Sequence, residues 1–191
     1  MITIAIDAST KSTGIAIFKD YELVDYKNLT SNDKNVLKRI KYMTDGIEDI
    51  YVRLMNHCFT RSLINAITDQ NIESHNVQIV MEQVIPDNLN DAKWTRNQAT
   101  FKALFYLQAA IVLMFDHYDL EVELIGASTW RKWCGIKQGG ANRDTLKFRD
   151  IQFVRDHYDD LDVNDDVADA ICLGHGKIHH EPEPAAFNWE D

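Results

Sequence analysis

Four acidic residues occupy positions from which a folded chain could present them together. Asp7 and Glu82 each follow directly on a short apolar run that reads as a buried strand, and Asp166 and Asp169 lie three residues apart in a predicted late helix. Residues three apart on a helix face the same side. Ligands of open α/β sheets bind beyond the carboxyl ends of the parallel strands. Parallel neighbouring strands would therefore bring all four carboxylates to one edge of a sheet.

This acidic set predicts a divalent-metal site. Carboxylates within a few ångströms of one another repel strongly unless a cation compensates their charge. Oxygen ligands with little His or Cys select Mg²⁺ or Mn²⁺ rather than Zn²⁺. Two such ions about 4 Å apart activate a water and stabilise the leaving oxygen of a phosphodiester. We therefore expect metal-dependent phosphodiester hydrolysis with two ions per site.

Each acidic position also has an ordinary structural explanation. An Asp after a strand forms turns, a Glu can end a strand, and acidic residues at a helix start favour the helix dipole. The combination in this order is more specific than its parts. Asp165 is a rival for Asp166 as a ligand, because Asp165 and Asp169 are also helix neighbours, at i and i+4.

Charge is distributed unevenly along the chain. The formal net charge is −10 over 191 residues, which at first sight argues against a nucleic-acid partner. Beyond residue 155, eleven acidic residues face one basic residue, so residues 1–155 hold 19 of each sign. Residues 131–155 carry seven basic and two acidic residues. The net negative charge thus belongs mostly to the C-terminal fifth of the chain, and a locally positive stretch precedes it. The alternative interpretation is the ordinary local variation of charge on any globular surface.

The apolar patterns predict an alternation of strands and helices. Strands are expected at 2–6, 14–18, 22–26, 77–81 and 122–125. Helices are expected at about 33–70, with a potential break near 44–46, and at 92–117, 128–133 and 142–157. A last helix is expected to begin at 164 or 165 and to end at about 175, with 179 as the alternative end. Three early strands with short connections predict an antiparallel start, and later strand–helix units predict parallel strands with right-handed crossovers. The predicted fold class is α/β, a mixed five-stranded sheet with its first three strands antiparallel and helices on both faces.

The helix predicted at 92–117 is apolar nearly all round. Such a helix must be covered on more than one side. One side would pack on the sheet and the other on a second subunit; a helix central to its own domain is the alternative. Its longest apolar stretch, 103–115, is shorter than the roughly 20 residues that span a bilayer, so no membrane partner is expected.

Cysteine usage and the first residues favour a location inside the cell. Three Cys without a CxxC pair do not make a disulfide framework. Residues 1–6 lack a basic region and lead at once to Asp7, unlike a secretory signal. We expect an intracellular, cytoplasmic protein.

Three segments in order resemble the motifs of the RuvC family of Holliday-junction resolvases, within the RNase H-like nuclease superfamily. They are Ile4–Ser9 with Thr13–Ala16, Val80–Val84, and Asp166–Ile171 with its acid-x-x-Asp-Ala step. The resemblance covers roughly residues 1–176. It implies an RNase H-like nuclease domain over 1–178. The residues that follow, 179–191, read as an acidic tail, which the family pattern does not contain. It also implies a homodimeric, divalent-metal endonuclease that nicks four-way DNA junctions symmetrically.

The resemblance carries the metal-ligand and catalytic roles to the four acidic residues Asp7, Glu82, Asp166 and Asp169. The family spacing of three favours Asp166 over Asp165. Ile85 takes the position at which the family often has an aromatic wedge. An apolar side chain there can still unstack bases, with weaker stacking.

The same resemblance places phosphate contacts around the loop at 135–140. The candidates are the basic residues in and after this loop, Lys137, Arg143 and Lys147. Lys93 and Arg96, at the start of the helix predicted at 92–117, are weaker candidates. Contacts of this kind are sensitive to salt and insensitive to base sequence. A solvated basic surface is the alternative.

Two further groups have competing interpretations. Trp130 and Trp133 are expected as core anchors, with base stacking as the alternative. Cys172, His175 and His179 make at most a partial zinc set on one helix, because no fourth ligand is evident; ordinary helix-end residues are the favoured interpretation.

Two other functions stay open. The spacing from Asp7 to Gly14 loosely fits the early phosphate loop of actin-like or sugar-kinase-like ATPases, although the chain is short for their two lobes. A non-catalytic branched-DNA-binding module would keep the fold without the chemistry. ATP hydrolysis without DNA would favour the first, and DNA binding without nicking the second.

Overall fold

A computed structural model describes residues 1–67, 76–84 and 92–180 of the chain. Its elements are, in order, β1 (Ile2–Asp7), β2 (Ser12–Lys19), β3 (Glu22–Thr30), α1 (Val36–Ile67), β4 (Val77–Glu82), α2 (Ala92–Asp116), β5 (Val122–Ile125), α3 (Ala127–Trp133), α4 (Arg143–His157) and α5 (Asp165–His179). The described strands form one five-stranded sheet in the order β3-β2-β1-β4-β5. β1, β2 and β3 pair antiparallel, and β4 pairs parallel with both β1 and β5. The predicted fold class is confirmed.

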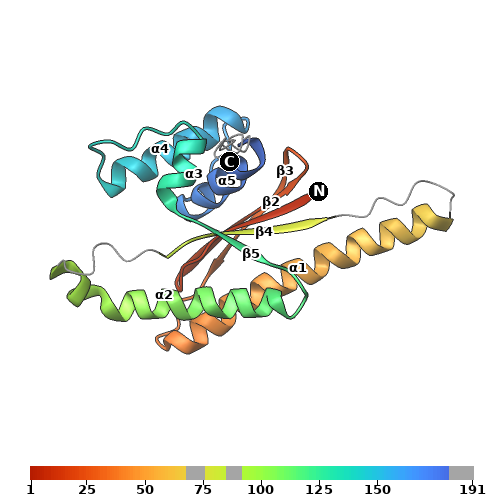
Figure 1. The fold of residues 1–191 in the computed structure, drawn as a ribbon, viewed down its shortest axis with the longest axis horizontal. Helices are drawn as coiled ribbons and strands as arrows, with labels where there is room; N and C mark the ends of the chain where they lie inside the picture. Colours follow the sequence, from red (N-terminus) through yellow and green to blue (C-terminus); the bar gives the residue numbers. More distant parts are fainter. Residues whose placement is uncertain (68–75, 85–91, 181–191) are drawn as a thin grey trace, which may run out of the picture.

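Alternating side chains of the strands build two cores, one on each face of the sheet. In β1, Ile4 and Ile6 join the core beneath α1 and α2, whereas Ala5 joins the core beneath α5. This alternation follows from the two-residue period of a strand. α1 and α2 therefore cover one face, and α3, α4 and α5 gather over the other (Figure 1).

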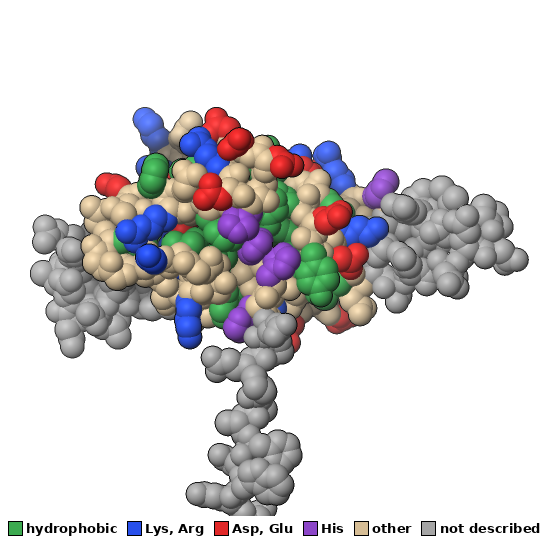
Figure 2. Space-filling view, turned by 90° about the horizontal axis from the view of Figure 1, so that it is seen from above, with side chains coloured by type: hydrophobic (Ala, Val, Ile, Leu, Met, Phe, Trp, Pro, Cys, Tyr) green, Lys and Arg blue, Asp and Glu red, His purple; other side chains and the backbone are tan. Residues whose placement is uncertain are grey.

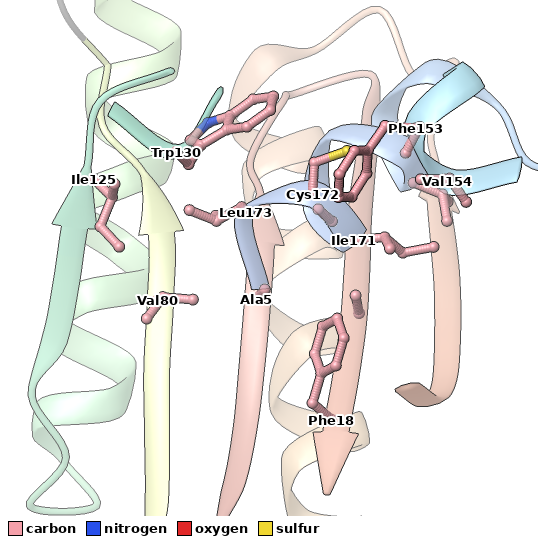
Figure 3. Packing of buried hydrophobic residues seen from close by; sticks show 14 of the residues in the cluster. Ala5, Phe18, Val80, Ile125, Trp130, Phe153, Val154, Ile171, Cys172 and Leu173 are labelled. Atoms are coloured by element: carbon pink, nitrogen blue, oxygen red, sulfur yellow. The ribbon is translucent and has the colours of Figure 1, made fainter. Parts of the chain in front are cut away.

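α5 is the central helix of the second core. Its buried residues Ile171 and Leu173 belong to the same hydrophobic cluster as the sheet residues Ala5 and Phe18 (Figure 3). The helix lies so close to β2 that a Cβ added at Gly174 would overlap the ring of Phe18. This close packing of α5 fixes where its first two turns, with Asp166 and Asp169, meet the sheet.

The structure corrects one expectation about α1. The potential break near Gly46 does not occur, and α1 continues through it to Ile67. The glycine serves packing instead, because a Cβ at Gly46 would lie 2.8 Å from a methyl carbon of Leu29 on β3. The sequence cue that suggested a break is therefore a site of close helix–strand approach.

α2 is buried on one side and exposed on the other. Leu107, Ile111 and Phe115 are fully buried against the sheet. Within the described residues, Gln98–Asp116 of this helix is long and apolar enough to cross a membrane by length and composition, with 22% of the segment buried. That length exceeds the apolar stretch counted from the sequence, because the helix continues through polar residues. A core helix can meet the same criterion.

The predicted boundary between the domain and the acidic tail falls near the end of α5. α5 ends at His179, one residue into the segment predicted as an acidic tail. The rest of that tail, residues 181–191, lies outside the described residues.

Candidate active site

All four predicted acidic residues line one pocket at the carboxyl-end edge of β1 and β4. The pocket has a volume of about 840 Å³, and its lining includes Asp7, Glu82, Asp166 and Asp169 together with Arg131, Arg143 and Lys147. The strands supply the first two acids and the first turns of α5 supply the others. Residues separated by as many as 162 positions thus meet, as the sequence pattern predicted.

Strand pairing sets the positions of Asp7 and Glu82. β1 and β4 run parallel with Ile6 opposite Met81, so the next residue on each strand reaches the same edge. The segment after Asp7 is pinned by Thr13, whose hydroxyl donates to the Ser9 carbonyl at 2.6 Å and accepts from the Ser9 amide at 3.2 Å. The turn beside the pocket is therefore anchored to β2.

Glu82 is held by a tryptophan from the core. The indole Nε1 of Trp130 donates a hydrogen bond to Glu82 Oε2 at 3.0 Å. Trp130 is fully buried, which agrees with the expected core anchor and excludes base stacking by this ring. Burial raises the pKa of Glu82 above its ordinary value, while the Trp130 hydrogen bond and the charge of Arg131 oppose the rise.

Asp7 and Asp169 are in a strongly anionic, buried environment. Burial, with the charges of Glu82 and Asp166, raises the pKa of Asp7 well above its usual range. Burial, with the charge of Asp7 and other acids, raises the pKa of Asp169 to about 9. Asp169 Oδ1 is buried without a hydrogen-bond partner among the described residues. Such a cluster calls for compensating positive charge.

The donor chemistry of the pocket suits a hard cation. As the side chains stand, the described residues form no ready group of three metal-binding His, Cys, Asp or Glu. The Asp169 oxygen that lacks a hydrogen-bond partner is nevertheless a carboxylate oxygen, the type of donor that a hard divalent cation prefers. The four acids of the pocket lining offer only oxygen donors, which suit Mg²⁺ or Mn²⁺ better than Zn²⁺.

The two rival aspartates at the start of α5 lie in different environments. Asp166 lines the pocket, and its charge raises the pKa of Asp7. Asp165 instead forms an ion pair with Lys147 of α4. Asn164 caps the helix by accepting a hydrogen bond from the Val167 amide at 3.0 Å, which fixes the register of both acids. Of these two aspartates, Asp166 is the one that lines the pocket.

Only some of the residues predicted to contact DNA line the acidic pocket. Arg143 is exposed at the first position of α4 and lines the pocket with Lys147. Lys137 is exposed in the adjacent loop but is not part of the lining, and its carbonyl accepts a hydrogen bond from Arg149. Ile85 lies outside the described residues, as do the side chains of Lys93 and Arg96.

Sequence reasoning missed several residues of the pocket. Arg131 was counted only as part of a basic stretch, yet its guanidinium lies inside the acidic cluster, 3.8 Å from Asp169 Oδ2. Phe101 and Leu104 line the opposite wall from α2. A basic residue directly after a buried Trp on a short helix was the one available signal for Arg131.

The partial zinc set is not assembled. Cys172 is fully buried, with its thiol directed at the Asp150 carbonyl at 3.6 Å. His175 shares a hydrogen bond with Tyr158, and burial lowers its pKa to about 4. Figure 2 shows histidine side chains gathered on the face above α4 and α5, but no metal-binding group of three exists among the described residues. The expected helix-end position holds for His179, the last residue of α5, whereas Cys172 is a core residue in the middle of the helix.

Comparison with known proteins identifies the fold. No family model and no curated protein matches the chain. The structure of Thermus thermophilus RuvC in complex with Holliday junction substrate matches with a TM-score of 0.58 at 8% identity, over 92% of both chains. A second structure of Thermus thermophilus RuvC matches with a TM-score of 0.56 at 10% identity, again over 92% of both chains.

A third match is looser. The fowlpox virus resolvase, solved with Holliday junction DNA, covers 93% of this chain at 15% identity, with a TM-score of 0.38. The first two matches define the class: the protein has an RNase H-like α/β fold. More particularly, the fold is that of RuvC-type Holliday junction resolvases, as the sequence motifs predicted.

Proposed function

We propose that the protein is a structure-selective DNA endonuclease that resolves Holliday junctions, and other branched DNA, by metal-dependent phosphodiester hydrolysis. One observation carries the proposal: on a RuvC-type fold, four carboxylates from β1, β4 and α5 line a single pocket whose rim is basic. A crossover junction endodeoxyribonuclease needs these features together. Binding modules need the rim but not the buried acids.

The four acidic residues are the proposed ligands of two Mg²⁺ or Mn²⁺ ions. When bound, such ions supply an activated water and neutralise charge on the leaving oxygen. The chain itself positions Glu82 through Trp130, and it positions Asp166 and Asp169 through the tightly seated α5. Burial excludes bulk water from the carboxylates, which strengthens their hold on a cation.

Arg143 and Lys147 are the proposed contacts to the DNA backbone at the pocket. Both project from the first two turns of α4 at i and i+4, so they can bracket one strand. Lys137 would extend the basic track from the adjacent loop, and Ile85 would act as the apolar wedge that unstacks bases at the branch. Phosphate contacts set position, so branch geometry rather than base sequence selects the substrate.

We infer that the active form is a homodimer built on the exposed side of α2. Phe105, Tyr106 and Leu113 on this helix are 37%, 60% and 68% exposed. Large apolar side chains gathered on one outer surface mark an interaction site. A two-fold axis would present two pockets to a junction of matching symmetry, giving paired nicks. We expect such a protein in the cytoplasm.

Labelled four-way, three-way, flap and linear DNA, each with and without Mg²⁺, test the proposal. Paired opposite nicks in the four-way substrate that require the ion are expected. Asp7→Asn should abolish nicking while DNA binding is retained, which separates an enzyme from a binding module. Equal cutting of linear duplex would exclude a resolvase, and ATP hydrolysis without DNA would favour the ATPase alternative.

A further inference from the structure

Beside the acidic pocket lies a buried ion pair that none of the proposed ligands accounts for. Asp150 of α4 is fully buried, and both of its oxygens accept hydrogen bonds from Arg131 of α3. Arg131 Nε lies 3.0 Å from Asp150 Oδ2, and Nη2 lies 2.8 Å from the same oxygen. The fork-to-carboxylate geometry fixes the plane of the guanidinium. Arg131 is therefore a cation with one defined orientation.

This fixed guanidinium contacts one carboxylate of the acidic pocket and the tryptophan that holds another. Its Nη2 is 3.8 Å from Asp169 Oδ2 on α5. Its Cζ lies 4.2 Å from the ring centre of Trp130, the residue whose Nε1 holds Glu82. Two consecutive residues of α3 thus reach two carboxylates that come from different elements. The other oxygen of Asp169, Oδ1, has no hydrogen-bond partner among the described residues.

We propose that Trp130, Arg131 and Asp150 form a positioning unit that sets the orientation of Glu82 and Asp169 for metal binding. The inference rests on the proposed function, since the metal is the one proposed there. Asp150 holds Arg131, Arg131 restrains one oxygen of Asp169 and leaves the other free, and Trp130 restrains Glu82. Partners behind the ligands that fix their orientation commonly strengthen metal binding.

Burial alone is a weaker explanation for this arrangement. A buried ion pair is seldom a net gain in stability, and an apolar pair of similar volume can replace it without loss. A pair retained only for packing would have no need to lie against two ligand carboxylates. The structure places this buried Arg131–Asp150 pair beside the acidic pocket, and an exchange for apolar residues can test whether that location matters.

The decisive variant replaces the whole ion pair, as Arg131→Met with Asp150→Leu. The matched control replaces the exposed pair Arg155 and Asp162, whose atoms lie 2.8 Å apart at the far end of α4, as Arg155→Met with Asp162→Leu. Affinity for Mn²⁺ alone is measured from the free-ion EPR signal, without DNA, beside the melting temperature. We expect the first double variant to fold and to lose roughly 10- to 100-fold in Mn²⁺ affinity, and the control to match wild type.

Two single variants keep the test decisive if the double variant does not fold. Trp130→Phe keeps the ring in the core but removes the donor to Glu82, and a several-fold loss of Mn²⁺ affinity is expected. Arg131→Lys keeps the charge without the fork, and should recover part of the affinity that Arg131→Gln loses. A purely structural role would lower the melting temperatures and leave the affinities of the folded fractions unchanged.

The outcomes separate this inference from the function on which it rests. Folded variants with wild-type Mn²⁺ affinity, and an unchanged Mn²⁺ requirement for nicking, would overturn the positioning unit while the nuclease stands. A wild-type protein that binds no Mn²⁺ and leaves branched DNA intact would remove the proposed function, and this inference with it. Reduced affinity in the variants beside an unaffected control supports both.

Discussion

Gly14 of β2 lies directly against the backbone carbonyl of Asp166 in the first turn of α5. A Cβ at this position would overlap the carbonyl oxygen and carbon of Asp166 and approach the amide nitrogen of Val167 at 2.8 Å. Gly14 is also the strand partner of Asp7. The missing side chain therefore lets the helix bring its carboxylates to the strand that carries the first acid.

Gly14→Ala should damage both stability and activity. The obstructing atoms belong to backbone that cannot rotate away, so we expect a cost of about 3 kcal/mol or more, which lowers the melting temperature by roughly 6–12 °C. Displacing the start of α5 also moves Asp166, so nicking should fall in the folded fraction. Thermal unfolding and junction cleavage measure the two effects.

Gly139→Ala is the matched control, because a Cβ there meets nothing within 4 Å. It should leave the melting temperature within about 2 °C of wild type, the range of a neutral surface change. A Gly14→Ala protein as stable and active as this control would show that the contact with Asp166 is not required.

The strands, the four acids and the order of elements were predictable because each leaves a local trace. The apolar runs that end at Asp7 and Glu82 can be recognised as strands from the neighbouring residues alone. The role of Gly14 and the place of Arg131 were not predictable, because both depend on how α5 and α3 pack on the sheet. Gly46 was misread for the same reason: glycine suggests a helix break locally, and only the neighbouring Leu29 explains its presence.

Asp169 should make the metal-free protein less stable as pH rises. Its folded pKa of about 9 lies far above the ordinary value near 3.9 in an unfolded chain. Between these values the folded state holds a proton that the unfolded state has released, so unfolding becomes easier with increasing pH. Asp169→Asn removes this dependence, and in EDTA at pH 8 it should melt at a higher temperature than wild type.

A bound divalent metal should reverse the order of the melting temperatures of wild type and Asp169→Asn. Added Mg²⁺ should raise the melting temperature of wild type at pH 8 but not that of Asp169→Asn, which should also be inactive. Asp162→Asn, at a side chain that is 87% exposed, is the control and should follow wild type throughout. Equal pH dependence in wild type and Asp169→Asn would show that Asp169 is not protonated in the folded protein.

Arg143 and Lys147 should each contribute one phosphate contact. Substitution of either by Ala should weaken junction binding at all sequences alike, and reduce the slope of log affinity against log salt by about 1. Fluorescence anisotropy in Ca²⁺ at several salt concentrations provides the slope. Lys41→Ala is the control, since this lysine lies on α1, pairs with Asp45 and is 75% exposed.

Loss of Lys147 has a second expected consequence. Without its ion pair, Asp165 becomes an uncompensated acid next to the pocket. The additional removal of Asp165, as Asp165→Asn in the Lys147→Ala background, should therefore restore part of the DNA affinity. An unchanged salt slope in both single variants would place the DNA path elsewhere on the surface.

The exposed side of α2 should hold two subunits together. Tyr106 and Leu113 are seven residues apart and share one side of the helix. Tyr106→Glu or Leu113→Glu would bury a charge at the contact, so both variants should sediment as monomers where wild type sediments as a dimer. Leu37→Glu on α1, a leucine 69% exposed, is the control and should stay dimeric.

The same variants should change the pattern of nicks. A monomer keeps all four carboxylates of its own pocket, so single nicks should persist while the paired opposite nicks of one binding event disappear. A wild-type protein that is monomeric at micromolar concentration would contradict this arrangement. If that monomer floated with phosphatidylcholine vesicles, and the Glu variants did not, the exposed side of α2 would face lipid instead of a second subunit.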